Sequence, residues 1–90
     1  MSVSVSIPTI LRSFTGNART VSASGATLGQ IIDDLERQFP GIGERLVENG
    51  ALRRFVNVYI NDEDVRFLGG VEASVSHGDA ITVLPAVAGG

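Results

Sequence analysis

The sequence predicts an α+β domain in which one main helix packs on one face of a mixed sheet of four to five strands. Three patterns support this fold class. Apolar and polar residues alternate at 2–7, apolar residues recur at helical spacing over 28–35, and strand-like alternation returns at 55–60 and 80–84. Ninety residues are enough for one domain with a single modest core.

The first two strands are predicted to form a hairpin. Residues 2–7 alternate serine with valine or isoleucine, which is typical of a strand with one buried face. Pro8 ends this strand because proline has no N–H to donate to a paired ladder. After a turn at 13–17, residues 19–23 are predicted as the second strand.

The main helix is predicted to follow Thr27. Thr27 and Gln30 have the spacing of a capping box. Apolar residues then recur on one helical face, while charged residues occupy the other. The Pro-Gly pair at 40–41 ends the helix. Residues 42–46 are expected to add a short turn, and 48–50 a loop.

The second half of the chain supplies the remaining strands. Residues 55–60 are predicted as a strand, residues 61–64 as a polar turn and residues 65–68 as a short edge strand. Residues 69–76 are expected to be irregular or a single helical turn. A tight turn at His77, Gly78 and Asp79 then leads into the last strand at 80–84.

The order of these elements defines the topology. A helix between a hairpin and later strands is a crossover connection, which packs on one face of a mixed sheet. This arrangement is the β-grasp, or ubiquitin-like, fold. We predict one β-grasp domain at 1–84, followed by a flexible C-terminal tail at 85–90 that ends in Gly-Gly.

The tail is predicted to thread into a partner's active site. Its two glycines have no Cβ, so the backbone can pass through a channel too narrow for any side chain. Pro85 stiffens the exit from the sheet, and six extended residues reach ~20 Å. The threading segment consists of Pro85, Ala86, Val87, Ala88 and Gly89.

The reactive group is predicted to be the terminal carboxylate of Gly90. The chain contains no cysteine and no lysine, which excludes thiolate and lysine-amine chemistry on its own side chains. A carboxylate is a poor electrophile, but an adenylate from ATP supplies a leaving group that a sulfur nucleophile can displace to give a thiocarboxylate. The activating enzyme must supply the nucleotide site, because the chain has no GxxxxGK loop.

A partner-docking patch is expected at the base of the tail. Strand parity directs Phe55, Tyr59 and Leu84 to the open face of the sheet, and aromatic-rich apolar areas are typical of interfaces. The alternative is that these are single exposed apolar residues. The acidic cluster at 62–64 is expected to be a solvated turn, and His77 to be structural.

Charge and hydropathy argue against a nucleic-acid-binding protein, a membrane-spanning protein and a secreted protein. The net charge is −3 and the seven basic residues are scattered along the sequence, so a nucleic-acid partner is not expected. No apolar run approaches the ~18 residues that span a bilayer. The opening residues lack the pattern of a signal peptide, so a cytoplasmic location is expected.

The sequence resembles the ThiS/MoaD family of ubiquitin-like sulfur carriers over nearly its whole length. The matching segments are SVSIPTILR, TVSASG, FVNVYINDEDVRF and GDAITVLPAVAGG. Within the family, the central block and the AVAGG ending are similar to the branch that serves actinobacterial cysteine biosynthesis.

The resemblance implies a sulfur-donating co-substrate rather than an enzyme, with no metal or cofactor bound to the chain itself. The implied partners are a MoeZ-like activating adenylyltransferase/sulfurtransferase, a sulfur-accepting synthase and a zinc-dependent JAMM-type peptidase. The synthase is implied to be a pyridoxal-phosphate cysteine synthase, with a thiazole-synthase-like or thiosugar synthase as other recipients. ATP, pyridoxal phosphate and zinc belong to these partners.

Two further interpretations of the tail stay open. One is a ubiquitin-like modifier that forms isopeptide bonds with lysines on target proteins. The other is an interaction module with an idle, frayed end. The residues before Gly-Gly are small and uncharged, unlike the basic residues and leucines of ubiquitin, which favours the carrier.

Overall fold

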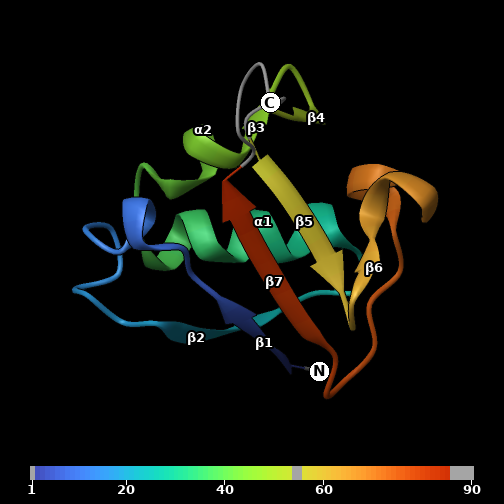
Figure 1. Cartoon of the computed structure of the whole chain (residues 1–90), viewed down its shortest axis with the longest axis horizontal. Coiled ribbons are helices and arrows are strands. Elements are labelled where there is room, and N and C mark those ends of the chain that lie inside the picture. Colours follow the sequence, from blue (N-terminus) through green and yellow to red (C-terminus); the bar gives the residue numbers. More distant parts are fainter. Residues whose placement is uncertain (1, 54–55, 86–90) are drawn as a thin grey trace.

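The computed structural model describes residues 2–53 and 56–85. A five-stranded mixed sheet has the order β2-β1-β7-β5-β6, with helix α1 on one face (Figure 1). β1 and β7 are parallel neighbours, and the other neighbouring pairs are antiparallel. These features confirm the predicted β-grasp fold. The strands of this sheet are β1 (Ser2–Ser6), β2 (Thr20–Ser24), β5 (Val56–Ile60), β6 (Glu63–Asp64) and β7 (Ala80–Pro85).

Two helices, a small hairpin and three single turns of 3₁₀ helix complete the described fold. The short helix α2 and the hairpin β3–β4 lie near the end of β7 (Figure 1). The elements are α1 (Leu28–Gln38), α2 (Ile42–Leu46), β3 (Val47–Glu48), β4 (Ala51–Leu52), η1 (Thr9–Leu11), η2 (Val65–Phe67) and η3 (Gly70–Glu72).

The start of α1 confirms Thr27 as the capping residue. Thr27 Oγ1 accepts a hydrogen bond from Gln30 N at 3.2 Å, and Gln30 Oε1 accepts one from Ala26 N at 2.8 Å. In a standard capping box the glutamine side chain would accept from Thr27 N, whereas here it accepts from Ala26 N, one residue earlier. The threonine bond satisfies an N–H group that the first helical turn would leave unpaired, and the glutamine bond ties the residue before the N-cap to the helix.

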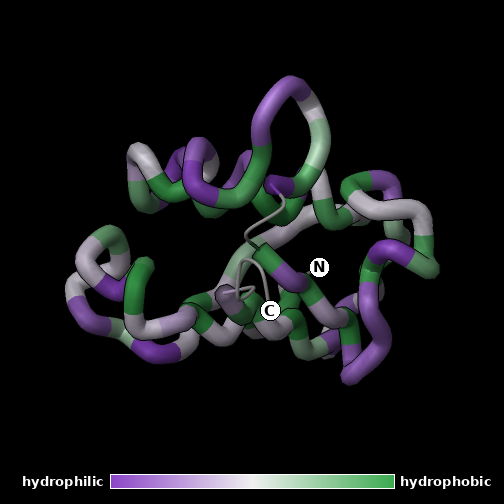
Figure 2. Tube along the Cα trace, turned by 45° about the horizontal axis from the view of Figure 1, so that its top comes forward, coloured by the Kyte–Doolittle hydropathy of each residue, from purple (hydrophilic) through white to green (hydrophobic). Residues whose placement is uncertain are grey.

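The core lies between α1 and the sheet. Hydrophobic and hydrophilic residues alternate in short stretches along the chain (Figure 2). The buried residues come from the inward positions of the strands and from the apolar stripe of α1, as the pattern predicts. Residues with 5% exposure or less include Val3, Val5, Ile7, Ala23, Leu28, Ile31, Ile32, Leu35, Val58, Ile60, Ile81 and Val83.

The carboxylate of Asp34 joins α1 to the end of β2. Asp34 Oδ2 accepts hydrogen bonds from Ser24 N at 3.0 Å and from Gln38 Nε2 at 2.9 Å, and Oδ1 pairs with Arg37. The Ser24 bond, followed by the Arg37 and Gln38 bonds, lowers the pKa of Asp34 below 3.8, although burial acts in the opposite direction.

Replacement of this group gives a testable stability change. Asp34→Ala should lower the free energy of unfolding at neutral pH by about 1–3 kcal/mol, because the Ser24 N–H loses its acceptor. The lowered pKa means that the carboxylate stabilises the fold above about pH 4, and that this stabilisation is lost as the pH falls through the folded-state pKa. Denaturant titrations from neutral to acidic pH should therefore show the difference between variant and wild type shrinking. Asp33→Ala, an exposed neighbour, is the control, and an equal loss there would contradict the assignment.

Residues 65–68 do not form the predicted edge strand. Residues 65–67 form the 3₁₀ turn η2, and the edge strand is β6, immediately before it. The Asp64 side chain accepts a hydrogen bond from Arg66 N at 2.9 Å and so caps the start of the 3₁₀ turn. Val65 is then fully buried, while Phe67 is 86% exposed.

The predicted boundaries shift at two other places. The loop at 48–50 is part of a hairpin, in which Glu48 pairs with Ala51 across a two-residue turn. Pro85 belongs to β7, opposite Val56, and not to the tail. Its place at the strand end agrees with the exclusion of proline from paired strand interiors.

Residues 2–53 and 56–85 include no helix that is both long and apolar enough to cross a membrane.

Candidate functional site

The predicted reactive group lies outside the described residues. Gly90, the segment 86–89 and Phe55 fall in the parts of the chain that the structure does not describe. The described part of the candidate site is therefore the point where the tail leaves the domain, at Leu84 and Pro85.

The end of β7 extends beyond its parallel neighbour. β1 pairs with β7 only as far as Ser6, opposite Thr82. On the other side β5 continues to the end of β7, so that Asn57 faces Leu84 and Val56 faces Pro85. The last residues of β7 thus have a strand on one side only, and cavities open around them.

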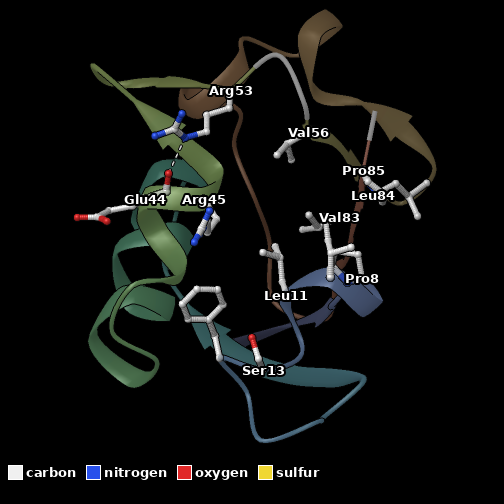
Figure 3. Close-up of a pocket in the computed structure, with 12 residues that line it drawn as sticks. Pro8, Leu11, Ser13, Glu44, Arg45, Arg53, Val56, Val83, Leu84 and Pro85 are labelled. Carbon is white, nitrogen blue, oxygen red and sulfur yellow. Dashed lines mark hydrogen bonds between the residues drawn. The ribbon is translucent and has the colours of Figure 1, made fainter. Parts of the chain in front are cut away.

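The larger cavity has a volume of about 780 Å³ and lies between the end of β7 and helix α2. Arg45 and Arg53 stand on one side of it, and Leu84 and Pro85 on the other (Figure 3). Its apolar wall contains Leu11, so the cavity combines two cations with hydrocarbon.

Packing and hydrogen bonds hold these two arginines in place. The guanidinium carbon of Arg45 lies 5.8 Å from the centroid of the Phe14 ring, within the range of a cation–π contact. Arg53 Nε donates to the backbone oxygen of Glu44 at 2.5 Å (Figure 3), and its Nη1 lies 3.3 Å from a carboxylate oxygen of Glu48.

Glu36 fixes the helix that carries Arg45. Its carboxylate accepts hydrogen bonds from Gly41 N at 2.9 Å and from Gly43 N at 2.8 Å, at the start of α2. A side chain on α1 thus caps the next helix, in the role that the N-cap residue usually plays. Gly41 has a φ of +101°, a conformation that favours glycine.

A second cavity of about 440 Å³ shares Leu84 and Pro85 with the first. Arg12, Arg19 and Thr82 are among its lining residues. Arg12 Nε donates to the backbone oxygen of Ile7 at 3.1 Å, which holds the guanidinium stem against the end of β1.

The folded chain therefore gathers basic residues that are scattered in the sequence. Four arginines line the two cavities that include Leu84 and Pro85, and we refer to them as the basic collar. The sequence does not predict this group, because its members lie beside or within four separate elements that only the topology brings together. The basic collar consists of Arg12, Arg19, Arg45 and Arg53.

The structure places two residues of the predicted docking patch on neighbouring strands. Leu84 is 45% exposed and faces Asn57, whereas Tyr59 faces Thr82 and is half-buried. Leu84 and Tyr59 are therefore diagonal neighbours, about 7–8 Å apart. Phe55 lies outside the described residues, so the complete patch stays a prediction.

Asp64 of the acidic cluster and His77 have structural partners, whereas Asp62 and Glu63 are exposed. Asp64 pairs with Arg66 at 2.6 Å, and hydrogen bonds from Arg66 lower the pKa of Asp64. His77 Nδ1 accepts a hydrogen bond from Ser2 N at 3.2 Å. In the part of the chain that the structure describes, no three His, Cys, Asp or Glu side chains are grouped to hold a metal ion.

Comparisons with known proteins agree with this architecture. The model of the ThiS family matches residues 5–90. The sulfur carrier protein CysO of Mycobacterium tuberculosis is 59% identical across the full length of both chains. The small archaeal modifier protein 3 of Haloferax volcanii is 40% identical over 72% of this chain and 71% of its own length.

Two solved structures are similar to this chain in both sequence and fold. A CysO from Amycolatopsis orientalis, solved in a complex with BexX, is 61% identical and superposes with a TM-score of 0.93 over 98% of this chain and 99% of its own. The Mycobacterium tuberculosis CysO crystal structure is 57% identical, with a TM-score of 0.90 over 94% of this chain and 99% of its own. By sequence and by structure, this chain belongs to the ThiS family.

Proposed function

We propose that the chain is a sulfur-carrier protein that delivers sulfur as a thiocarboxylate on Gly90. The observation that carries the proposal is full-length identity of 59% to proteins named sulfur carrier protein CysO. The sequence agrees with it, since Gly89 and Gly90 close a chain that has neither cysteine nor lysine. The chain is then a co-substrate of other enzymes rather than an enzyme.

The proposed chemistry has two steps. A carboxylate oxygen of Gly90 attacks the α-phosphorus of ATP, which forms an acyl adenylate and releases pyrophosphate. A sulfide-level nucleophile then attacks the acyl carbon, AMP leaves with the former carboxylate oxygen, and a thiocarboxylate and a proton remain. The second step needs the adenylate, because a free carboxylate at neutral pH is ionised and resists nucleophiles.

The proposed partners supply the machinery for this cycle. A MoeZ-like adenylyltransferase/sulfurtransferase uses the ATP, a pyridoxal-phosphate cysteine synthase accepts the sulfur, and a JAMM-type zinc peptidase releases the product. A thiazole-synthase-like or thiosugar synthase is a further recipient. A CysO that is 61% identical to this chain forms a complex with BexX, which supports docking of this chain on a partner protein.

The absence of cysteine allows a direct test. After incubation with ATP, a sulfide source and a MoeZ-like enzyme, the intact mass should rise by the difference between one sulfur and one oxygen. A thiol-selective alkylating reagent should then add one label, because the unreacted chain offers no thiol. Oxidation of Met1 gives nearly the same mass rise but no label, which makes the alkylation decisive.

The outcomes separate the candidate functions. An ATP-dependent label that maps to the C-terminal peptide supports the carrier. A chain that gains no label with any such activator, while a known family carrier is labelled in the same assay, contradicts it. Covalent conjugates with lysine-containing proteins, without alkylation, would instead support the isopeptide-forming modifier.

A further inference from the structure

The charges of the domain are distributed unevenly. Four of the six described arginines form the basic collar around Leu84 and Pro85. The other two, Arg37 and Arg66, are paired with Asp34 and Asp64 away from the two cavities. Arg53 pairs with Glu48, whereas Arg12, Arg19 and Arg45 form no ion pair with a described residue. The unpaired cationic surface of the described chain is therefore concentrated where the tail begins.

Few carboxylates balance the collar. Among the described acidic residues, only Glu44 lines either of the two cavities, and Glu48 pairs with Arg53 from outside them. The chain as a whole carries a net charge of −3. The negative potential of an acidic partner surface therefore orients the chain so that the basic collar approaches that surface first.

Apolar surface lies between the arginines. Ile10 is 67% exposed and Leu84 is 45% exposed, and both line the two cavities together with Pro8 and Pro85. Arg45 covers one face of Phe14. A complementary surface must therefore offer carboxylates to the guanidinium groups and hydrocarbon between them.

We propose that the basic collar docks on an acidic segment, with carboxylates and apolar side chains interleaved, at the mouth of the active site of the enzyme that activates the tail. The assignment to this enzyme rests on the proposed function. Pro85 directly precedes the tail, so a surface seated on the collar lies at the entrance through which the tail must pass. The collar then fixes the depth at which the carboxylate arrives, and steers the encounter.

Two double variants with the same change of charge test the proposal. R19Q/R45Q removes two collar charges, and R37Q/R66Q removes two charges elsewhere, where the side chains are 79% and 67% exposed. Arg12 and Arg53 are kept because they donate to backbone oxygens. Pyrophosphate exchange by the activating enzyme, with the carrier as the varied substrate, gives kcat and KM at low and high salt.

We expect R19Q/R45Q to raise KM for the carrier about tenfold at low salt, with kcat unchanged. High salt should raise the wild-type KM toward that of the variant, since it screens exposed charges. R37Q/R66Q should stay within about twofold of the wild type. R19K/R45K should recover most of the affinity, because it restores the charge on a similar stem.

Three results would count against the collar. These are equal KM values for the two glutamine variants, a KM change that is independent of salt, and a lysine variant as weak as the glutamine variant. Thermal unfolding of each variant excludes a folding defect as the cause. If the wild type itself is not adenylated, the proposed function fails, whereas activation of all variants alike overturns only the docking proposal.

Discussion

Deletion of Gly90 is expected to abolish adenylation of the chain while its fold stays intact. The deletion withdraws the terminal carboxylate by about 3.4 Å and places Ala88 in the penultimate position, where a side chain obstructs a narrow channel. A misplacement of 1 Å in an active site can cost about a hundredfold in rate, so the loss should exceed that factor. Pyrophosphate exchange and thiol labelling after activation measure it.

The second part of this expectation is that the domain without Gly90 is as stable as the wild type. The described core residues all lie between Val3 and Val83, so the free energy of unfolding should change by less than about 0.5 kcal/mol. Deletion of Ala88 is the matched control, because it shortens the tail equally but keeps Gly-Gly at the end. It should be activated more weakly than the wild type and better than the Gly90 deletion. Normal activation without Gly90, or loss of folding, would contradict the predicted role of the tail.

The main elements of the fold could be predicted because each has a local signal. Alternation over 2–7 and 80–84 places one set of side chains inward, and the structure buries Val3, Val5, Ile81 and Val83. The capping pattern after Thr27 fixes the helix start, since the threonine and glutamine bond to nearby backbone groups. These signals act over fewer than ten residues and do not depend on distant contacts.

The prediction was wrong where turn geometry overrode residue preference. Residues 65–68 have the β-branched and aromatic composition of a strand, but the two-residue turn at Asn61 and Asp62 decides where the edge strand forms. These two residues have positive φ values of 50° and 73°, so β6 pairs at once and η2 comes after it. The Asn49-Gly50 pair forms the same kind of turn, and it was the available signal for the hairpin.

The two parts of the candidate site differ in the signal that the sequence offers for them. The sequence predicts Gly90 as the reactive group because the chain has neither cysteine nor lysine, and this stays a prediction because Gly90 lies outside the described residues. The basic collar has no such signal, because Arg45 and Arg53 come to line one cavity and Arg12 and Arg19 the other only when β7 lies between β1 and β5. Proximity that depends on strand order has no counterpart in spacing along the chain.

Replacement of Gly41 should have the largest effect on stability of any single glycine substitution near the collar. Gly41→Ala is expected to lower the free energy of unfolding by about 2–4 kcal/mol, which combines backbone strain with overpacking. The residue has a φ of +101°, and a Cβ there would lie 2.9 Å from Phe14 Cε1. Chemical denaturation measures the loss.

Gly50→Ala is the control that separates the two contributions. Gly50 also has a positive φ, of +80°, but an added Cβ meets no described atom within 4 Å. It should therefore report backbone strain alone, and the larger effect at Gly41 should report the contact with Phe14. Similar losses for both variants would show that this contact contributes nothing.

The contact with Phe14 also connects the helix start to the proposed docking surface. Arg45 rests on the Phe14 ring, so a ring displaced by Gly41→Ala moves a collar charge without altering the tail. We therefore expect Gly41→Ala to raise KM for activation while kcat is retained. In a Phe14→Ala background, the stability cost of Gly41→Ala should fall to that of Gly50→Ala, because the clashing ring is gone. If the cost of Gly41→Ala is undiminished in that background, the destabilisation comes from the backbone alone, and this turn has no link to the collar.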